Sequence, residues 1–200
     1  MRVLFLGSHC DDIELGCGGT ISKYKNEWEM IAVTLSNDGL SHSMPELKEY
    51  SQKALCQLGL TESLYYNFPV STFWEVRQDI WLTLHELEKR YKPDLVFTQQ
   101  EDSHQDHTTL FQESMRNFTN CNVMLYCSNF TNDLSKYWNW FEVLDENDVK
   151  AKLDTAKEYP CYDGKFYFNV KNIEAQLRVC GMYAEAEYAE GFTLSKKIVK

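Results

Sequence analysis

Short, almost continuously apolar runs alternate along the chain with segments whose apolar residues recur every three or four positions. The runs of the first kind lie at residues 3–6, 30–35, 64–68, 95–98 and 123–127. Continuous apolar runs of this length are typical of strands that are covered on both faces. Helical spacing is found at residues 47–58, before a stop at Gly59, and at residues 76–91. The pattern therefore predicts strands that alternate with helices.

This alternation favours an α/β fold, a single Rossmann-like domain with a right-handed, mostly parallel, doubly wound sheet and helices on both faces. A chain of 200 residues is long enough for one large core, so we expect residues 1–200 to form one domain. In the less regular tail we predict a strand at residues 138–143 and a helix at residues 146–159. Ile173, Leu177 and Cys180 indicate a further helix.

Two short polar strings carry imidazole and carboxylate groups, and each follows a predicted strand. His9-Cys10-Asp11-Asp12-Ile13-Glu14 follows the first strand, and His104-Gln105-Asp106-His107 follows the fourth. In doubly wound sheets, ligands bind beyond the carboxyl ends of the strands, at the point where the strand order reverses. We therefore expect the two strings to converge on one site.

His9, Asp12 and His107 together offer two imidazole nitrogens and one carboxylate oxygen. This donor set suits Zn²⁺ with one position left for water. It also suits Fe²⁺ or Co²⁺, because two histidines and a carboxylate do not select the metal by themselves. We expect a metal site, with zinc as the first candidate.

The remaining polar residues of the two strings are candidates for proton transfer. Asp11 is adjacent to the ligands and not needed as one, so it is placed to act as general base toward an attacking water. His104, one helical turn before His107, is a candidate to stabilise an oxyanion or to protonate a leaving amine. Asp106 or Asp102 would orient the ring of His104. This inventory is what the hydrolysis of an amide needs.

Plainer interpretations apply to several other residues. Either string alone could be a solvated turn or a helix cap, but their joint placement at the switch point favours a site. Gly16-Cys17-Gly18-Gly19-Thr20 lacks the spacing of a phosphate-binding loop, and we expect it to allow close helix packing. We expect His42 and His85 on helix surfaces, and Tyr137, Trp138 and Trp140 in the core rather than against a sugar.

Composition narrows the classes of partner. The formal net charge is −10 without a cluster of Lys and Arg, which argues against nucleic acid or an anionic membrane as the main partner. The first apolar run is too short for a secretory signal, and no other segment is long enough to span a bilayer. The seven cysteines are irregularly spaced without a C-x-x-C pair, so we expect mostly buried thiols in a cytoplasmic protein.

The segments His9 to Thr20 and Asp102 to His107 resemble the two signatures of the PIG-L/LmbE-like N-acetylglucosaminyl deacetylases. A weaker likeness extends to residues 36–39, 54–59 and 188–192. The resemblance implies a Rossmann-like fold and a zinc-dependent hydrolase that removes acetyl, or sometimes another acyl group, from the 2-amino nitrogen of a GlcNAc-type sugar. It implies the same roles: zinc ligands at His9, Asp12 and His107, a general base at Asp11 and an oxyanion-stabilising histidine at His104.

The chain also departs from the family pattern. Cys10 and Gln105 replace two signature prolines, and neither change removes a ligand. Many members have a substrate-contacting Arg at the start of the helix that ends in Leu-Gly, and the matching position here is Leu47. That difference concerns recognition of the group attached to the sugar, not the hydrolysis. We further expect Asp38 and Asp102 to bind substrate.

The hypothesis from the sequence is a deacetylase of a small N-acetylated amino sugar that is free, nucleotide-linked or attached to a small aglycone. One alternative is an amidase that acts on another N-acyl compound or on a thiol-sugar conjugate. Another is a non-haem Fe²⁺ oxygenase, which the strand–helix alternation disfavours. A third is a non-catalytic sugar-binding or nucleotide-binding domain. The sequence leaves a homo-oligomer open.

Overall fold

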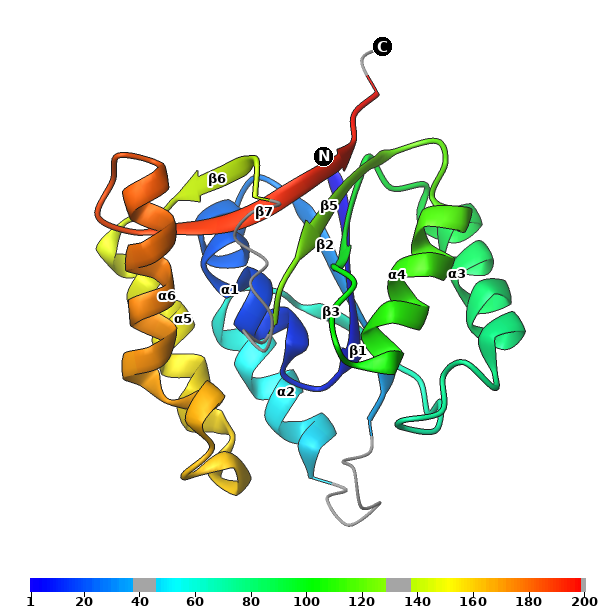
Figure 1. The fold of residues 1–200 in the computed structure, drawn as a ribbon, viewed down its shortest axis with the longest axis horizontal. Helices are drawn as coiled ribbons and strands as arrows, with labels where there is room; N and C mark the ends of the chain where they lie inside the picture. The colour runs from blue at the N-terminus through cyan, green and yellow to red at the C-terminus, as the bar shows by residue number, and fades with distance from the viewer. Residues whose placement is uncertain (38–45, 129–137, 199–200) are drawn as a thin grey trace.

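The computed structural model describes residues 1–37, 46–128 and 138–198, which are built around one seven-stranded sheet (Figure 1). The strands are β1 (Arg2–His9), β2 (Glu29–Ser36), β3 (Glu62–Tyr65), β4 (Leu95–Gln99), β5 (Asn122–Tyr126), β6 (Trp140–Val143) and β7 (Ala189–Lys196). Their order across the sheet is β3-β2-β1-β4-β5-β7-β6. Pairing is parallel from β3 to β5 and antiparallel where β7 meets β5 and β6. The predicted mostly parallel α/β sheet is confirmed.

Helices cover both faces of this sheet. They are α1 (Asp12–Tyr24), α2 (Leu47–Gln57), α3 (Arg77–Tyr91), α4 (Gln105–Asn117), α5 (Glu146–Thr155) and α6 (Val170–Tyr183). Figure 1 shows α3 and α4 on one side of the sheet, and α1, α2, α5 and α6 on the other.

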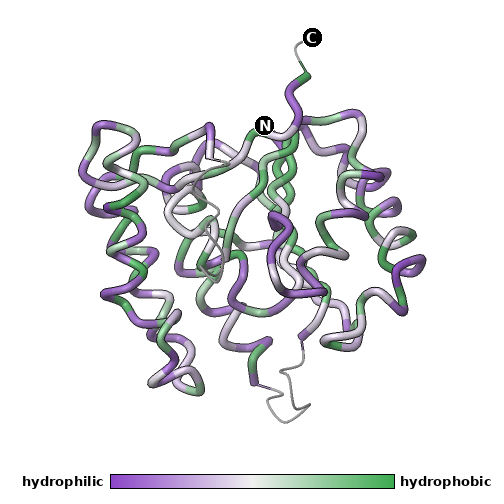
Figure 2. The backbone as a smooth tube through the Cα atoms, in the orientation of Figure 1, coloured by the Kyte–Doolittle hydropathy of each residue, from purple (hydrophilic) through white to green (hydrophobic). Residues whose placement is uncertain are grey.

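Side chains alternate between the two faces of each strand, so the sheet contributes residues to two separate cores, one on each face. Leu4 and Leu6 of β1 belong to the core that includes Ile80 of α3. Val3 and Phe5 belong to the opposite core, with residues of α1 and α2. Figure 2 shows the apolar positions concentrated along the central strands. Burial on both faces explains why these strands appear in the sequence as continuous apolar runs.

Some boundaries differ from the predictions. β3 begins earlier than the predicted run at residues 64–68, although the N–H groups of Tyr66 and Phe68 still donate to carbonyls of β2. The helix predicted at residues 146–159 ends at Thr155 and continues as short 3₁₀ turns at Ala156–Glu158 and Pro160–Tyr162. Pro160 lacks the N–H that a longer α-helix would need.

The last strand, β7, was not predicted. Its residues alternate weakly, and Glu190 on its buried side is charged. A buried carboxylate in a strand hides the apolar period on which strand prediction rests. The segment therefore becomes a strand because it pairs with β5 on one side and β6 on the other.

The glycine-rich part of α1 is packed closely against its neighbours, as predicted. A Cβ atom on Gly16 would lie 2.0 Å from the ring of Tyr126, and one on Gly19 would lie 2.3 Å from Leu144. Glu190 accepts hydrogen bonds from the backbone N–H groups of Gly19 and Thr20. The glycines thus let Tyr126 of β5, Glu190 of β7 and Leu144, just before α5, approach the helix that begins in the first motif.

Other predictions have mixed outcomes. Trp140 is 37% exposed, so the expectation that it lies in the core is wrong: as an edge-strand residue it turns outward and its indole N–H donates to Glu142. Trp138 is half-buried, and His85 lies half-buried on the surface of α3. Tyr137 and His42 lie outside the described residues.

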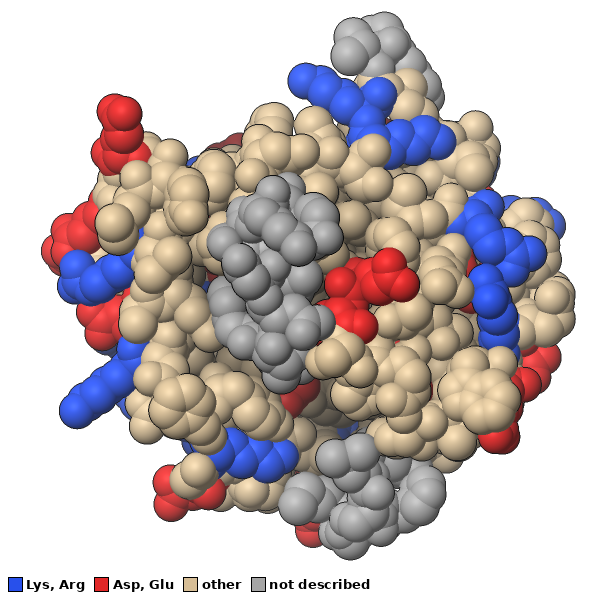
Figure 3. Space-filling model, viewed as in Figure 1, with Lys and Arg blue, Asp and Glu red and all other residues tan. Residues whose placement is uncertain are grey.

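The cysteines and the charged surface of the described residues agree with the predictions made from the composition. Five of the seven cysteines are buried, and the described part of the chain contains no disulfide. In the described ranges, no helix is both long and apolar enough to cross a bilayer. On the face shown in Figure 3, Lys and Arg do not gather into one continuous basic surface, and acidic side chains lie among them.

Candidate active site

The two polar strings meet at the centre of the sheet. The first leaves the carboxyl end of β1 and begins α1, and the second follows β4 and begins α4. β1 and β4 are adjacent parallel strands, and the strand order reverses between them. The predicted convergence at the switch point is confirmed, because parallel neighbours end at the same edge of the sheet.

His9, Asp12 and His107 form a compact group of possible metal ligands. One donor atom from each of the three lies within 4.8 Å of the others. The Asp12 carboxylate lies 3.5 Å from Nδ1 of His9 and 3.5 Å from Nε2 of His107. Asp12 and His107 are buried, and the side chain of His9 is 18% exposed.

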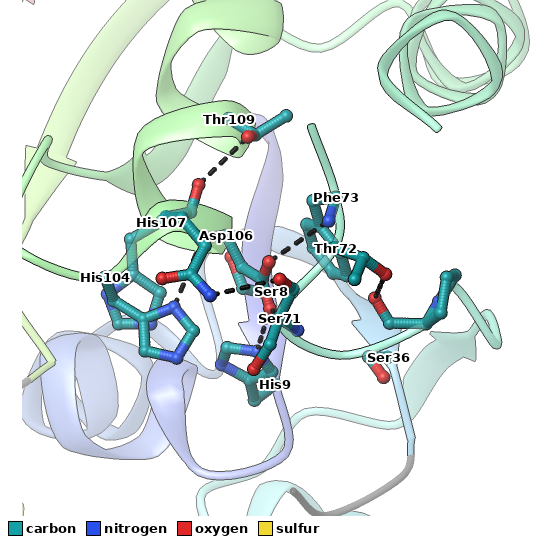
Figure 4. Close-up of polar contacts among 12 residues, drawn as sticks. Ser8, His9, Ser36, Ser71, Thr72, Phe73, His104, Asp106, His107 and Thr109 are labelled. Atoms are coloured by element: carbon teal, nitrogen blue, oxygen red, sulfur yellow. Dashed lines mark hydrogen bonds and ion pairs between the residues drawn. The ribbon is translucent and has the colours of Figure 1, made fainter. Parts of the chain in front are cut away.

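Each histidine of this group turns its other ring nitrogen to an outer carboxylate. His107 Nδ1 lies 2.7 Å from Asp102. His9 Nε2 lies 2.9 Å from Asp106 (Figure 4). A carboxylate on the far nitrogen fixes the tautomer and makes the inner nitrogen a better ligand. The donor set and this outer pairing therefore fit a divalent metal such as Zn²⁺.

The outer carboxylates are themselves held in place. Asp106 is fully buried and accepts hydrogen bonds from the backbone N–H groups of Ser71, at 2.7 Å, and Phe73, at 3.2 Å. Asp102 accepts a bond of 2.7 Å from the backbone N–H of His104. Its side chain is only 3% exposed and lies 2.7 Å from Nδ1 of His107, so it supports that ring; the expected contact of Asp102 with substrate stays a prediction.

His9 lies between two carboxylates. Burial alone would lower the pKa of His9, but its hydrogen bonds to Asp106 and Asp12 raise that pKa to about 10. The same pairing, with the charge of His107, lowers the pKa of Asp12 against the effect of burial. The centre thus strongly favours positive charge between its carboxylates, which a divalent cation also supplies.

Asp11 stands beside the ligand group with an unusual backbone. It is the residue before α1, and its φ of 114° lies in the left-handed region that non-glycine residues rarely adopt. Burial, followed by repulsion from Asp12, raises its pKa well above the ordinary value for an aspartic acid. Among the described residues, none donates a hydrogen bond to its carboxylate. A carboxylate without a structural partner and with a raised pKa is suited to proton transfer.

His104 is the cap of α4, and its ring lies against the other two histidines. Its Nδ1 accepts a bond of 3.2 Å from the backbone N–H of Asp106, and its ring centre lies 4.7 Å from that of His107. The expectation that Asp106 or Asp102 orients this ring is wrong, because both carboxylates are used by the other histidines. Burial, with repulsion from His9, lowers the pKa of His104. The neutral ring therefore carries its proton on Nε2, which no described residue bonds.

A network of polar side chains that contacts Asp12 was not predicted from the sequence. Gln99, at the end of β4, accepts hydrogen bonds from the backbone and hydroxyl of Ser8 and donates to the hydroxyl of Ser128. Ser128 in turn bonds Asp12. The signal was present: Gln99 and Gln100 are polar residues at the end of an otherwise apolar strand.

A second feature that the sequence did not predict is a group of packed aromatic side chains from the C-terminal region, Tyr159, Tyr162 and Phe168, here called the aromatic wall. Tyr159 and Tyr162 pack in one apolar cluster with Cys10 and Leu15, on either side of the Asp11-Asp12 pair in sequence. The hydroxyl of Tyr159 donates a bond of 2.6 Å to Glu14, whose pKa burial raises to about 7. No motif indicated this wall, because it is made by packing alone.

The remaining predicted residues have these positions. Asp38 lies outside the described residues. Leu47 is 2% exposed and belongs to the same cluster as Tyr162. Cys10 is buried there as well, which agrees with a packing role. Gln105 donates a bond of 3.0 Å to the carbonyl of Ser71 and so helps to hold the loop that binds Asp106.

Comparison with known proteins adds a family and several relatives. The family model for PIG-L, GlcNAc-PI de-N-acetylase, matches residues 4–117, a range that contains both polar strings. The uncharacterised deacetylase YaiS of Escherichia coli strain K12 is 31% identical over 121 residues. That match covers 56% of this chain and 65% of YaiS, so it leaves about a third of the relative uncovered.

Solved structures share the fold at low identity. The conserved protein TT1542 of Thermus thermophilus has a TM-score of 0.79 at 20% identity, with 99% of this chain and 96% of that chain covered. The N,N'-diacetylchitobiose deacetylase of Pyrococcus horikoshii has a TM-score of 0.68 at 19% identity, with 96% and 82% covered. GalB of Pseudomonas putida KT2440, a 4-carboxy-2-hydroxymuconate hydratase, has a TM-score of 0.76 at 15% identity, with 100% and 98% covered. The fold therefore carries more than one reaction.

Proposed function

Because the chain belongs to the GlcNAc-PI de-N-acetylase family, we propose that it is a metal-dependent N-deacetylase of a GlcNAc-type amino sugar. The substrate would be free, nucleotide-linked or attached to a small aglycone, and the product would be acetate with the free amine. The observation that carries the proposal is the His9–Asp12–His107 group with Asp11 beside it. The names of YaiS and of the chitobiose enzyme, both deacetylases, support the same reaction class.

His9, Asp12 and His107 would hold the metal, with Zn²⁺ as the first candidate and Fe²⁺ or Co²⁺ as alternatives. When bound, such an ion supplies a Lewis acid that polarises the acyl carbonyl and makes water nucleophilic at neutral pH. The outer carboxylates Asp102 and Asp106 each hold the ring proton of the neutral histidine on its outer nitrogen, so that the lone pair of the inner nitrogen points to the metal. Asp106 therefore acts as a positioning residue for His9, not for His104.

Asp11 and His104 would move the protons and stabilise charge. Asp11 takes the proton of the attacking water, since its raised pKa and unbonded oxygens make it a competent base. The Nε2–H of His104 then donates to the oxygen that becomes negative on the acyl carbon, because its Nδ1 is occupied as an acceptor by the N–H of Asp106. Asp11, now protonated, gives that proton to the leaving amine nitrogen.

We further propose that residues 1–200 act as one deacetylase domain. The support is that the single sheet joins the motif strands β1 and β4 to the last strand β7. The C-terminal wall at Tyr159 and Tyr162 packs against the residues that flank Asp11-Asp12. We also propose action in the cytoplasm on a small amino sugar, a setting in which cysteines outside disulfides stay reduced.

The experiment that tests the function is acetate release from a panel of N-acetylglucosamine derivatives. Zn²⁺-loaded protein would be compared with chelator-treated protein, with Asp11→Asn, and with the exposed-helix control Asp79→Asn. We expect metal-dependent acetate release that Asp79→Asn retains and Asp11→Asn loses.

The other outcomes separate the alternatives. Release of a different acid from an acylated amine would replace acetyl by another acyl group. Sugar binding without release of any acid, with metal bound, would indicate a binding domain. Oxygen consumption with Fe²⁺ would indicate an oxygenase, and water addition to a substrate double bond would indicate chemistry like that of the hydratase that shares the fold.

A further inference from the structure

The strands β1 and β4 separate toward their carboxyl ends, where the strand order reverses. Their paired positions end at Phe5 and Phe97, well before His9 at the end of β1. On its other side, β1 remains paired with β2 as far as His9. Ser8 lies in the part of β1 that has left β4, and it is fully buried. Its backbone N–H therefore needs an acceptor that the main chain of β4 does not supply.

The side chain of Gln99, the last residue of β4, supplies this acceptor. Its Oε1 accepts a bond of 3.0 Å from the backbone N–H of Ser8 and one of 2.6 Å from the Ser8 hydroxyl. Its Nε2 donates a bond of 3.1 Å to the hydroxyl of Ser128, which follows β5. All three residues are buried. One amide thus joins the ends of β1, β4 and β5.

A backbone donor sets the direction of every bond in this series. Because a main-chain N–H can only donate, it turns Oε1 of Gln99 toward Ser8 and leaves Nε2 for Ser128. The Ser128 oxygen accepts from Nε2, so its single proton remains for the Asp12 carboxylate, to which it donates. Asp12 also accepts a bond of 2.7 Å from the backbone N–H of His9. Two donors therefore hold this carboxylate at the edge of the sheet.

We infer that Gln99 is a positioning residue for Asp12, on which it acts through Ser128, and that this series of hydrogen bonds sets how tightly the site holds a divalent metal. The inference rests on the proposed function, in which Asp12 is a ligand. Hydrogen bonds to a ligating carboxylate fix its orientation toward the metal. Without the amide, the Ser128 hydroxyl loses its donor and is free to rotate, so one of the two donors on Asp12 is no longer fixed.

A purely structural role would need only the first half of the series. The bonds from Ser8 to Oε1 satisfy a buried N–H, whereas the bonds from Nε2 to Ser128 and on to Asp12 serve the ligand. Thr98 offers a comparison on the opposite face of the same strand. Its hydroxyl lies 3.0 Å from that of Ser114 on α4, and both residues are fully buried. Loss of either interaction should lower stability, but loss of the Gln99 amide should also weaken metal binding.

The test measures metal affinity by competition with a chelator, for Zn²⁺ and for Co²⁺, whose absorption spectrum reports the arrangement of the ligands. Gln99→Met removes the amide and keeps the length of the side chain, and Ser128→Ala removes the hydroxyl. We expect each to weaken metal affinity about 10- to 100-fold and to change the Co²⁺ spectrum. Ser128→Thr, which keeps the hydroxyl, and the matched control Thr98→Val should bind both ions like wild type.

A double variant tests whether Gln99 acts through Ser128. Gln99→Met combined with Ser128→Ala should lose no more affinity than the more affected single variant, because both changes break one series. Losses that multiply would show two independent effects and would overturn the inference. Urea denaturation checks that each variant is folded. If Gln99→Met is not folded, Gln99→Asn takes its place, since this shorter amide cannot reach both Ser8 and Ser128 and should weaken metal binding in the same way.

Metal affinity is measured without substrate, so failure of this inference is distinct from failure of the proposed function. If the variants weaken metal binding as expected but wild-type protein releases no acid from any sugar, the inference stands and the proposed reaction falls. If wild-type protein releases acetate and the folded Gln99 variant binds metal like wild type, the inference is overturned and the proposed reaction stands. Wild-type protein that binds neither ion would overturn both.

Discussion

The two sides of the candidate site are built in different ways. The motif side consists of His9 to Asp12 after β1 and His104 to His107 after β4, and adjacent parallel strands bring these segments together. The other side, Tyr159 to Phe168, consists of short 3₁₀ turns held by aromatic rings, one pair stacked and another edge-to-face. The family match at residues 4–117 covers the first side and stops before the second. The residues that we propose for the reaction therefore lie in two local motifs, whereas the other side of the site depends on tertiary packing.

The largest expected effect comes from removing the proposed base on the motif side. Asp11→Asn keeps the size of the side chain and a residue type that tolerates a positive φ. We expect kcat to fall about 10²- to 10⁴-fold, the usual contribution of a general base, with metal content unchanged near one per chain. Metal analysis beside acetate kinetics would check this. Loss of metal in this variant would make Asp11 a ligand instead.

His104→Ala should have the next largest effect. It removes the Nε2–H that we assign to the developing oxyanion, so kcat should fall about 10²- to 10³-fold. Circular dichroism and metal analysis would show that the helix α4 and the metal site persist, although the cap is lost. A kcat equal to that of wild type would exclude the assigned role.

We expect Asp102→Asn to weaken metal binding and to leave substrate binding unchanged. The new amide would donate to Nδ1 of His107, which favours the tautomer whose proton is on Nε2, the nitrogen that faces Asp12. Metal affinity should fall about 10- to 100-fold, as is usual when an outer partner of a ligand is changed. Competition with a chelator would measure the change. Activity lost at saturating metal, with affinity intact, would return Asp102 to the substrate.

The smallest effect is expected where the two sides are joined. Tyr159→Phe removes the hydroxyl that bonds the buried Glu14, while Ser51 continues to donate to that carboxylate. The free energy of unfolding should fall by about 1–3 kcal/mol, with a smaller effect on kcat than on the motif side. Urea denaturation would measure the first and acetate kinetics the second. A loss in kcat as large as that of Asp11→Asn would show that the wall takes part in the chemistry.

The sequence predicted what local pattern and topology determine. Apolar runs located β1, β2, β4 and β5, and the switch-point rule then placed His9 beside His107. The packing role of the glycines in α1 also followed from their spacing. These features depend on strand geometry, which a sequence period reports directly.

Features that depend on which of several side chains bonds a given polar group could not be predicted. The sequence predicts that Asp106 or Asp102 orients His104, but the fold brings His9 from the neighbouring strand to Asp106, and the N–H groups of Ser71 and Phe73 also bond this carboxylate. Glu190 and the aromatic wall could not be predicted for the same reason, because Glu190 bonds Thr20 and Tyr159 bonds Glu14, each more than a hundred residues away. No period or spacing in a single sequence records such partners.

The ion pair behind α1 has a consequence for how the protein is made. Glu190 bonds Gly19 and Thr20, and Lys152 bonds both Glu190 and the carbonyl of Leu15, so groups from α5 and β7 grip the middle of the helix that begins with Asp12. A ribosome releases residue 190 long after the two motifs have emerged. The nascent chain would carry every proposed ligand before these bonds can form, so α1 would reach its final place only as the last strand enters the sheet.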